Sequence, residues 1–263
     1  MSKRALKRQL REGAFDAGQF EGDDKIRRLP LDRGGWSPLG GHHGNHHGGH
    51  NDDRDQGYLK TIKAKSEGQE ELIKAIDEKN LVVALGPAGT GKTYLAIAKA
   101  VEALESGRVG RIVLSRPAVE AGESIGFLPG DAEDKLAPYL RPLYDALSDR
   151  LSMKRVRALM AEGAIEIAPV GFMRGRTLNN AFVVIDEAQN CTYVQLKMLL
   201  TRLGWHSTMV VTGDPNQSDL LPELSGLGPV AEKLEAVSNI AVVRLKDRDI
   251  VRHPLVAEML GVL

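Results

Sequence analysis

Short apolar runs alternate with longer amphipathic stretches along most of this chain, beginning near Tyr58. Continuous apolar runs bounded by polar or turn-forming residues are typical of buried strands. They predict strands at Leu81–Leu85, Arg111–Ser115, Ala164–Ala168, Ala181–Ile185, Ser207–Thr212 and Ile240–Leu245. Between these runs, the apolar residues recur at the spacing of one helix face. This spacing predicts helices at Glu67–Glu78, Thr93–Leu104, Ala137–Leu147, Ser152–Glu162, Thr192–Leu203 and Pro229–Ala236, and a last helix after Pro254.

This alternation of strands and helices indicates an α/β fold. Strands that are apolar along their whole length are buried on both faces, which is the pattern of a mostly parallel sheet with helices on both faces. One such sheet accounts for the elements of residues 56–263, so we predict a single domain there. Ligands of open parallel sheets bind beyond the carboxyl ends of the strands, and functional residues are therefore expected at those ends.

Residues 1–55 differ in composition from the rest of the chain. They hold glycine doublets and the tract His42–His50, with too few apolar residues to offset the entropy cost of folding. We therefore predict that residues 1–55 form a disordered His- and Gly-rich arm. Glycines surround the histidines and cannot hold metal ligands rigidly. We expect adventitious binding of Ni²⁺ or Zn²⁺ there and no specific structural metal site.

Charge balance, cysteine content and apolar-run length limit the partners and the compartment that we expect for this protein. The 35 Lys and Arg side chains balance 35 Asp and Glu, so the net charge gives no argument for binding nucleic acid. The lone Cys191 excludes an internal disulfide and suits a reducing compartment. No apolar stretch approaches the length of a membrane span, and Met1–Arg11 lacks the apolar middle of a signal peptide. We expect a cytoplasmic protein without a membrane partner.

A glycine-rich turn joins the first predicted strand to the helix that follows it. Its residues complete the phosphate-binding P-loop pattern: Gly86, Pro87, Ala88, Gly89, Thr90, Gly91, Lys92 and Thr93. The glycines let successive N–H groups point inward, and the helix amino end adds the positive end of its dipole. Lys92 is then expected to reach the β- and γ-phosphates, and the Thr93 hydroxyl to bind Mg²⁺. An ordinary βα turn needs neither side chain, so the pattern predicts binding of a nucleoside triphosphate.

A second strand, Ala181–Ile185, ends in two acidic residues. Asp186 is placed to hold Mg²⁺ through its water shell, and Glu187 to orient and deprotonate the attacking water. An acidic pair can merely end a strand. Downstream of a complete P-loop, however, the pair favours hydrolysis of ATP.

Two further polar positions are candidates for recognising the nucleotide. The strand Ser207–Thr212 leads into Gly213–Gln217, where a polar side chain beside the γ-phosphate can distinguish ATP from ADP. Gln217 is the first candidate and Asn216 the second, with a plain Asp-Pro turn as the alternative. Gln69, on the helix before the first strand, carries an amide that can bond the N6 and N7 edge of adenine. A surface glutamine is the alternative there.

These motifs resemble those of superfamily 1 helicases and, more specifically, of PhoH-like proteins. The resemblance runs from about Tyr58 to Leu263. Its most specific segments are Ser115–Glu120, Gly122–Gly130, Met173–Asn179, Ser225–Leu227 and Asp249–Leu255. It implies a single RecA-like P-loop NTPase domain in a cytoplasmic ATPase that is linked to RNA metabolism, with RNA as a candidate partner and predicted RNA helicase activity. Residues 1–55 depart from relatives that carry an N-terminal nuclease domain or a small nucleic-acid-binding domain.

Several arginines are candidates for contacting phosphates. Arg116 follows a predicted strand end, and Arg174 and Arg176 flank a glycine in the loop before the acidic strand. A helicase of this superfamily closes its nucleotide site between two RecA-like lobes. This sequence has one P-loop and room for only one such lobe. An arginine finger must then come from Arg248 or Arg252, in cis or in trans, and Arg252 is preferred because it lies inside the family-specific run. A finger from a neighbouring copy predicts a homo-oligomer, most naturally a ring.

Three other classes of protein share part of this pattern. An AAA+ ATPase needs a longer chain after Gln217 for its helical lid, and Asp186 with Glu187 favours water over a kinase substrate as the attacking group. A nucleotide-gated RNA-binding or scaffold module with negligible turnover stays open. The favoured hypothesis is Mg²⁺-dependent binding and hydrolysis of ATP, coupled to RNA binding or remodelling. Its catalytic residues are Lys92, Glu187, Gln217 and Arg252.

Overall fold

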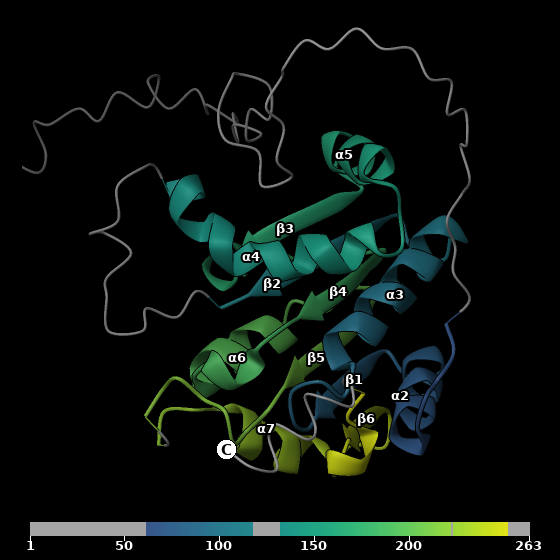
Figure 1. The fold of residues 1–263 in the computed structure, drawn as a ribbon. Coiled ribbons are helices and arrows are strands. Elements are labelled where there is room, and N and C mark those ends of the chain that lie inside the picture. Colours follow the sequence, from purple (N-terminus) through teal and green to yellow (C-terminus); the bar gives the residue numbers. More distant parts are fainter. Residues whose placement is uncertain (1–61, 118–131, 222, 252–263) are drawn as a thin grey trace, which may run out of the picture. The chain divides into compact units, whose positions relative to one another are not determined.

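The structure, a computed structural model, describes residues 62–117, 132–221 and 223–251 (Figure 1). The predicted arm at residues 1–55 and the predicted helix after Pro254 lie outside these ranges. The boundary between the arm and the domain therefore stays a prediction.

Six strands form one parallel sheet. Their bounds are β1 Leu81–Leu85, β2 Arg111–Arg116, β3 Ile165–Pro169, β4 Ala181–Ile185, β5 Thr208–Gly213 and β6 Ile240–Arg244. Every pairing between neighbours is parallel, and the order across the sheet is β3-β2-β4-β5-β1-β6. The predicted strands and their parallel arrangement are confirmed.

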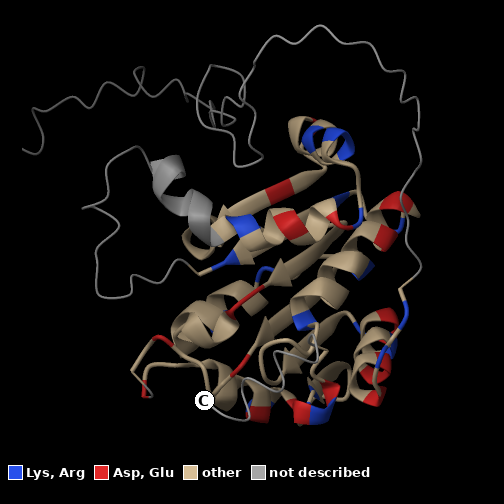
Figure 2. Cartoon of the chain, viewed as in Figure 1, with Lys and Arg blue, Asp and Glu red and all other residues tan. Residues whose placement is uncertain are grey.

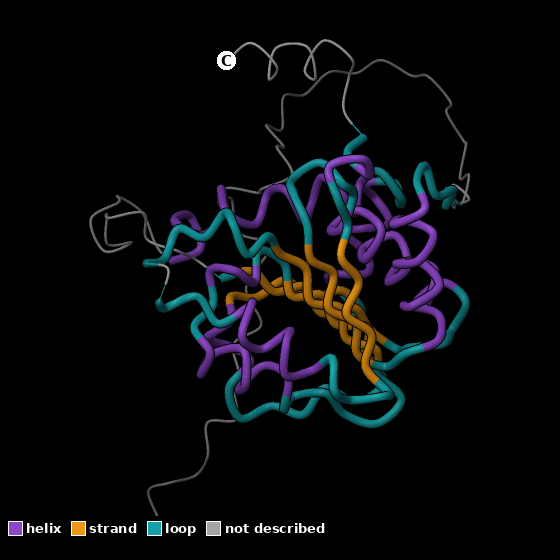
Figure 3. Tube along the Cα trace, turned by 90° about the horizontal axis from the view of Figure 1, so that it is seen from below, coloured by secondary structure: helices purple, strands orange, loops and turns teal. Residues whose placement is uncertain are grey.

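Helices cover both faces of the sheet, as predicted (Figure 3). Their bounds are α2 Glu67–Glu78, α3 Lys92–Glu105, α4 Ala132–Ser148, α5 Met153–Ala161, α6 Tyr193–Leu200 and α7 Leu227–Leu234. Buried side chains of α2, α3, α4 and α5 form one apolar cluster with the sheet, and those of α6 and α7 form the other. Short 3-10 turns lie at η2 Val170–Met173, η3 Ala188–Asn190 and η4 Asp247–Asp249. None of the helices in the described ranges is long and apolar enough to cross a membrane.

The two clusters explain why the strands read as unbroken apolar runs. Successive side chains of a strand point to opposite faces. Along β4, Phe182 and Val184 pack with α3 and its neighbours, while Val183 and Ile185 pack with α6 and α7. With both faces covered, every position of β4 is buried and must be apolar.

The helix that follows the acidic strand is shorter than its predicted range Thr192–Leu203. Thr192 is its N-cap and forms a capping box with Gln195, so the helix begins at Tyr193. After Leu200 the chain bends away, because Leu203 forms a parallel bridge with Leu178 and the Arg202 carbonyl accepts the Leu178 N–H. A tertiary pairing ends this helix before its apolar pattern does.

The strand register brings three strand ends to one edge of the sheet. β5 lies between β1 and β4, with Leu85 opposite Gly213 and Ile185 opposite Val211. The Gly86 N–H donates to the Gly213 carbonyl over 3.2 Å, which joins the ends of β1 and β5. The P-loop, the acidic pair and the turn after β5 therefore meet at the edge where ligands of parallel sheets bind.

Candidate active site

The P-loop backbone adopts conformations that require glycine. Gly86 has a φ of 142°, and a Cβ added there would lie 2.5 Å from the Leu245 carbonyl oxygen. Gly89 and Gly91 each have a φ of 85°. L-residues with side chains rarely take up these angles, so glycine is what lets the chain curl around an anion at the amino end of α3.

Lys92 lies under this curl with only 8% of its surface exposed. Its Nζ donates to the carbonyl oxygens of Gly86 at 2.5 Å and Pro87 at 2.8 Å. Burial lowers the pKa of Lys92 from its ordinary value, and the carboxylates of Asp214, Glu187 and Asp186 oppose that shift. A cation partly stripped of water and held beside the loop is poised to take a phosphate as partner.

Three oxygens meet where Mg²⁺ was predicted. Thr93 Oγ1 donates to Asp186 Oδ1 at 2.5 Å, and Thr212 Oγ1 donates to the same carboxylate oxygen at 2.7 Å. Asp186 is buried, with 3% of its surface exposed. Hydroxyl and carboxylate oxygens are the ligands that Mg²⁺ prefers, so this donor set fits the ion. The sequence did not single out Thr212.

Glu187 is held in a strained backbone conformation at the end of β4. Its φ is 53°, in the left-handed region that non-glycine residues occupy at a cost. Gln189 Nε2 donates to Glu187 Oε2 at 2.5 Å. This backbone conformation and the hydrogen bond from Gln189 orient the carboxylate toward the cavity that it lines, as expected of a group that must orient a water molecule.

Arg116, at the end of β2, lies against both acids. Its Nη1 is 3.8 Å from Asp186 Oδ2, and its Nη2 is 3.5 Å from Glu187 Oε1. The structure therefore places this predicted phosphate-contacting arginine within the site. It offsets the charge of the two carboxylates, and a phosphate contact from Arg116 stays a prediction.

Gln189 organises the site and was missed as a functional residue. Besides its bond to Glu187, its Oε1 accepts the Asp214 N–H at 3.1 Å, and its Nε2 donates to the Gln217 carbonyl at 3.4 Å. One buried amide thus joins the acidic strand to the turn after β5. The only signal in the sequence for a role of Gln189 was its place in the helicase-like motif Asp186–Gln189.

A cavity of about 290 Å³ opens between these groups. Its walls are formed by Ala88, Gly89, Gly91, Lys92, Thr93, Tyr94, Asp186, Glu187, Gln189, Gly213, Asp214 and Gln217. Gln217 lines the cavity from an exposed position, while Asn216 is not among the lining residues. Gln217, the first candidate for sensing the γ-phosphate, thus lies at the cavity, and this role stays a prediction.

Gln69 contacts the P-loop from outside the cavity. Its Nε2 donates to the Thr90 carbonyl at 2.9 Å, and its Oε1 accepts the Lys65 N–H at 2.9 Å. The side chain is buried rather than on the surface, with 5% exposed. The structure thus shows support of the loop, and recognition of adenine by this amide stays a prediction.

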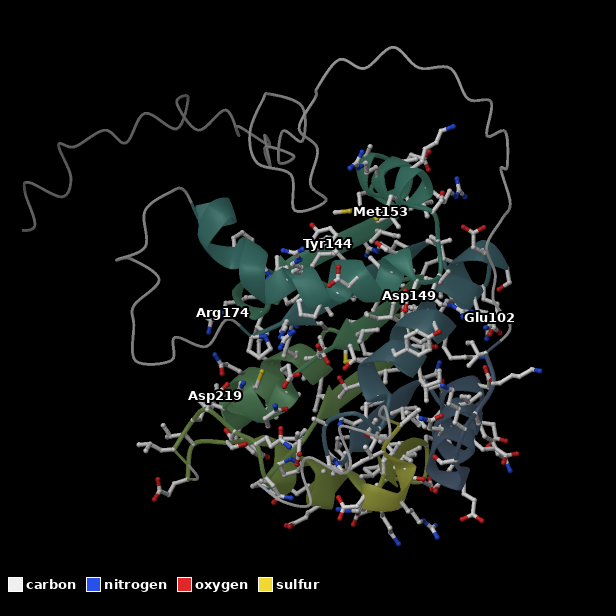
Figure 4. The ribbon with its side chains drawn as sticks, in the orientation of Figure 1. Glu102, Tyr144, Asp149, Met153, Arg174 and Asp219 are labelled. Carbon is white, nitrogen blue, oxygen red and sulfur yellow. The ribbon has the colours of Figure 1, made fainter. Side chains whose placement is uncertain are left out.

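Three other candidate arginines of the described ranges, Arg174, Arg176 and Arg248, do not line the cavity. Arg176 makes a two-pronged ion pair with Glu166 of β3, at 2.5 and 2.7 Å, so the prediction of a phosphate contact there gives way to a structural pair. Arg174 is exposed on the loop after η2 (Figure 4). Arg248 forms an exposed ion pair of 3.0 Å with Glu67. Arg252 lies outside the described residues.

Cys191 is a buried core residue, as expected. It is 0% exposed within the α6 and α7 cluster, and burial raises the pKa of its thiol to about 12. Because the thiolate is the reactive form, we expect iodoacetamide to label the folded protein more than about tenfold more slowly than the urea-unfolded chain. Mass spectrometry of timed samples would measure both rates, and equal rates would show that the thiol is accessible.

Comparison with known proteins identifies the family. The chain matches the PhoH family, described as PhoH-like protein, over residues 61–263. It is 54% identical over 202 residues to the PhoH-like protein of Bacillus subtilis, covering 76% of this chain and 63% of that protein. It is 54% identical over 201 residues to the PhoH-like protein of Mycobacterium tuberculosis, covering 76% and 57%.

A more distant relative belongs to the same family. The Protein PhoH of Escherichia coli is 45% identical over 205 residues, covering 77% of this chain and 58% of that protein. The matched region thus spans 57% to 63% of the length of these relatives, which is less than two thirds. The match includes the P-loop, the acidic pair and the turn after β5. This chain belongs to the PhoH family of P-loop nucleotide-binding proteins.

Proposed function

We propose that this protein hydrolyses ATP in a Mg²⁺-dependent reaction coupled to RNA binding. The observation that carries the ATPase proposal is the convergence of Lys92, Thr93, Asp186 and Glu187 on one cavity. A site that only bound nucleotide would need the P-loop but not a carboxylate fixed like that of Glu187. Since ATP is supplied in the cytoplasm, the activity is proposed to act there.

Each polar side chain has a separate task in the proposed reaction. Lys92 leaves the P-loop carbonyls and binds the β- and γ-phosphates, while Glu187 orients a water molecule and accepts its proton as the water attacks. Mg²⁺, held by Thr93 and through water by Asp186, would neutralise charge on the phosphates. Gln217, at the rim of the cavity, reports whether the γ-phosphate is present.

The coupling to RNA rests on the resemblance to superfamily 1 helicases and on a basic helix. The sequence of α5 contains Lys154, Arg155 and Arg157 and no acidic residue (Figure 2). Arg155 is engaged with Glu105 at 3.4 Å. A helix of this charge at the side of the sheet suits the phosphates of a nucleic-acid strand. RNA is the proposed partner. We propose that RNA binding stimulates hydrolysis of ATP, or that this hydrolysis remodels the bound RNA.

A homo-oligomer is proposed to complete the site. The cavity is open at Gln217, and an open site stabilises developing charge poorly. Arg248 forms an exposed ion pair with Glu67 of its own chain. Arg252 is the preferred finger because it lies inside the family-specific run Asp249–Leu255. The described chain reaches the P-loop just before it, where the Val251 N–H donates to the Gly89 carbonyl at 2.9 Å. This contact allows Arg252 to serve its own nucleotide in cis. We prefer a neighbour's Arg252 in a ring, because a single lobe leaves one side of the site open.

Mixing two inactive variants tests the trans finger. The Arg252→Ala chain has an intact P-loop but no finger. The Lys92→Ala chain has an intact finger but lacks the P-loop lysine. In an equal random mixture about one quarter of the sites have both groups, so we expect about a quarter of the wild-type turnover per chain. The measurement is steady-state hydrolysis of ATP, with native mass spectrometry to show that mixed oligomers form.

Two results would reject this part of the proposal. One is a mixture that stays inactive although mixed oligomers are present. The other is a wild-type protein that is monomeric and fully active. Closure of the site would then have to come from within the chain, either from Arg252 in cis or from Arg116 beside Asp186 and Glu187.

A nucleotide-gated module with negligible turnover is the second candidate function. The open cavity and the exposed Gln217 favour it, since a gated module needs only to report the γ-phosphate. Release of inorganic phosphate from ATP separates the two functions. The ATPase proposal expects multiple turnovers with Mg²⁺ and none when EDTA removes the ion.

A further inference from the structure

Asp249 is a buried acid outside the cavity lining, and the proposed reaction does not use it. It belongs to η4 and is only 2% exposed. Its Oδ1 accepts the Gly68 N–H at 3.2 Å, and its Oδ2 accepts the Lys246 N–H at 2.8 Å. The backbone hydrogen bond from Lys246 lowers the pKa of Asp249, and a hydrogen bond from the Ser66 hydroxyl adds to this shift. The carboxylate thus joins two segments that lie 181 positions apart in the sequence.

One of these segments is the amino end of α2, which continues to the P-loop. Ser66 is the N-cap of α2, and its oxygen accepts the Gln69 N–H at 3.3 Å. The side chain of Gln69 then donates to the Thr90 carbonyl at 2.9 Å. A Cβ on Gly68 would lie 2.5 Å from Asp249 Oδ2, so the helix and the carboxylate are in close contact.

The other segment is Lys246–Val251, here called the terminal segment. It follows β6, and the Val251 N–H donates to the Gly89 carbonyl at 2.9 Å. The terminal segment and Gln69 therefore hold two consecutive carbonyls of the P-loop, those of Gly89 and Thr90. Asp249 is the side chain that ties these two supports to each other.

These bonds determine which way the P-loop N–H groups point. In a planar trans peptide, the C=O of one residue and the N–H of the next point in opposite directions. Since the carbonyls of Gly89 and Thr90 are bonded to partners outside the loop, the N–H groups of Thr90 and Gly91 face the opposite side. That side is the cradle in which successive N–H groups bind phosphate.

We propose that Asp249 is a positioning residue for nucleotide phosphate, acting through Gln69 and Val251 on the N–H groups of Thr90 and Gly91. This inference rests on the proposed nucleotide site, because it concerns how that site is preorganised. Asp249 does not touch the nucleotide. Removing it leaves Lys92 and Glu187 in place, so binding is affected and the chemical step is spared.

The test compares two acids of the same 3-10 turn in the full chain. Asp249→Asn removes one acceptor and the charge, while Asp247→Asn removes an exposed charge next to it. Titration calorimetry with MgADP is expected to show that Asp249→Asn raises the Kd about tenfold. A change of this size corresponds to the loss of one charge-assisted hydrogen bond. For Asp247→Asn the Kd is expected to stay within about twofold of wild type. The kcat at saturating ATP is expected to fall less than the affinity.

The same titration separates positioning from a merely structural role. Irreversibly unfolded protein lowers the number of sites and leaves their Kd unchanged. A reversible unfolding equilibrium raises the apparent Kd only by the reciprocal of the folded fraction, which thermal unfolding of the variant measures. Positioning raises Kd about tenfold in a protein that is almost fully folded. An unchanged Kd in Asp249→Asn would overturn the inference. A wild-type protein that bound no MgADP would overturn the nucleotide site itself, which is a different result.

A second pair of variants does not depend on the folding of Asp249→Asn. Alanine is the better helix former, so Gly68→Ala should not weaken α2. Its methyl group would displace the Asp249 carboxylate, and a loss of MgADP affinity similar to that of Asp249→Asn is expected. In the Asp249→Ala background, the same Gly68→Ala change is expected to add no further loss. Gly68→Ala with wild-type affinity, or fully additive losses, would contradict the proposal.

Discussion

Lys92→Ala is expected to lose both nucleotide affinity and turnover. The ammonium is buried beside the P-loop carbonyls of Gly86 and Pro87, and no other lysine or arginine lines the cavity in the described part of the chain. Its removal takes away the charge that faces the phosphates, so turnover is expected to fall about a hundredfold or more. Titration with MgADP and steady-state hydrolysis of ATP would measure the two losses.

Lys99→Ala is a matched control for this variant. Lys99 lies on the same helix α3, is also buried, and pairs with Asp77 at 2.7 Å and Glu102 at 3.0 Å. Its replacement is expected to lower thermal stability and to leave the Kd for MgADP unchanged. If both lysine variants weakened binding equally, the loss would reflect the stability of α3 and not a phosphate contact.

Glu187→Gln is expected to keep ATP bound and to slow hydrolysis by roughly a hundredfold or more, as for the loss of a general base. The amide has the shape of the carboxylate and can still accept the Gln189 Nε2 hydrogen at its oxygen. It cannot accept a proton from water. The measurement is a single-turnover rate at saturating ATP, together with the Kd for ATP from calorimetry.

An exposed acid provides the comparison for Glu187→Gln. Glu223 lies on the loop after β5 and is exposed, and Glu223→Gln removes the same charge without touching the cavity lining. Its rate is expected to match wild type. A Glu187→Gln protein that hydrolyses ATP at the wild-type rate, or loses ATP affinity as severely as Lys92→Ala, would contradict the role of a base.

The fold was largely predictable from the sequence because its strands are buried on both faces. Leu81–Leu85 and Ala181–Ile185 are unbroken apolar runs, followed directly by Gly86 and Asp186. The predicted bounds of these two strands therefore match the observed bounds residue for residue. The order of the strands was not predictable. Placing β5 between β1 and β4 depends on pairings between residues far apart in the sequence, and local patterns do not encode these.

The site was predictable where its chemistry lies in short motifs and not where it depends on tertiary contacts. The cavity brings the P-loop, Asp186, Glu187 and Gln217 together as expected. Gln189 and Asp249 were missed because their roles arise from partners on other elements, the turn after β5 and the amino end of α2. Both residues stand in runs that resemble the family, Asp186–Gln189 and Asp249–Leu255, but a single sequence does not show which partners they contact.

The central claim is that the protein turns over ATP and that RNA influences this turnover. The most direct test is steady-state hydrolysis of ATP by the full chain, with and without single-stranded RNA, on a sample of measured oligomeric mass. We expect Mg²⁺-dependent turnover that rises when RNA is added and falls by roughly a hundredfold or more in Glu187→Gln. Tight binding of ATP with no phosphate release under either condition would contradict it and would favour the nucleotide-gated module.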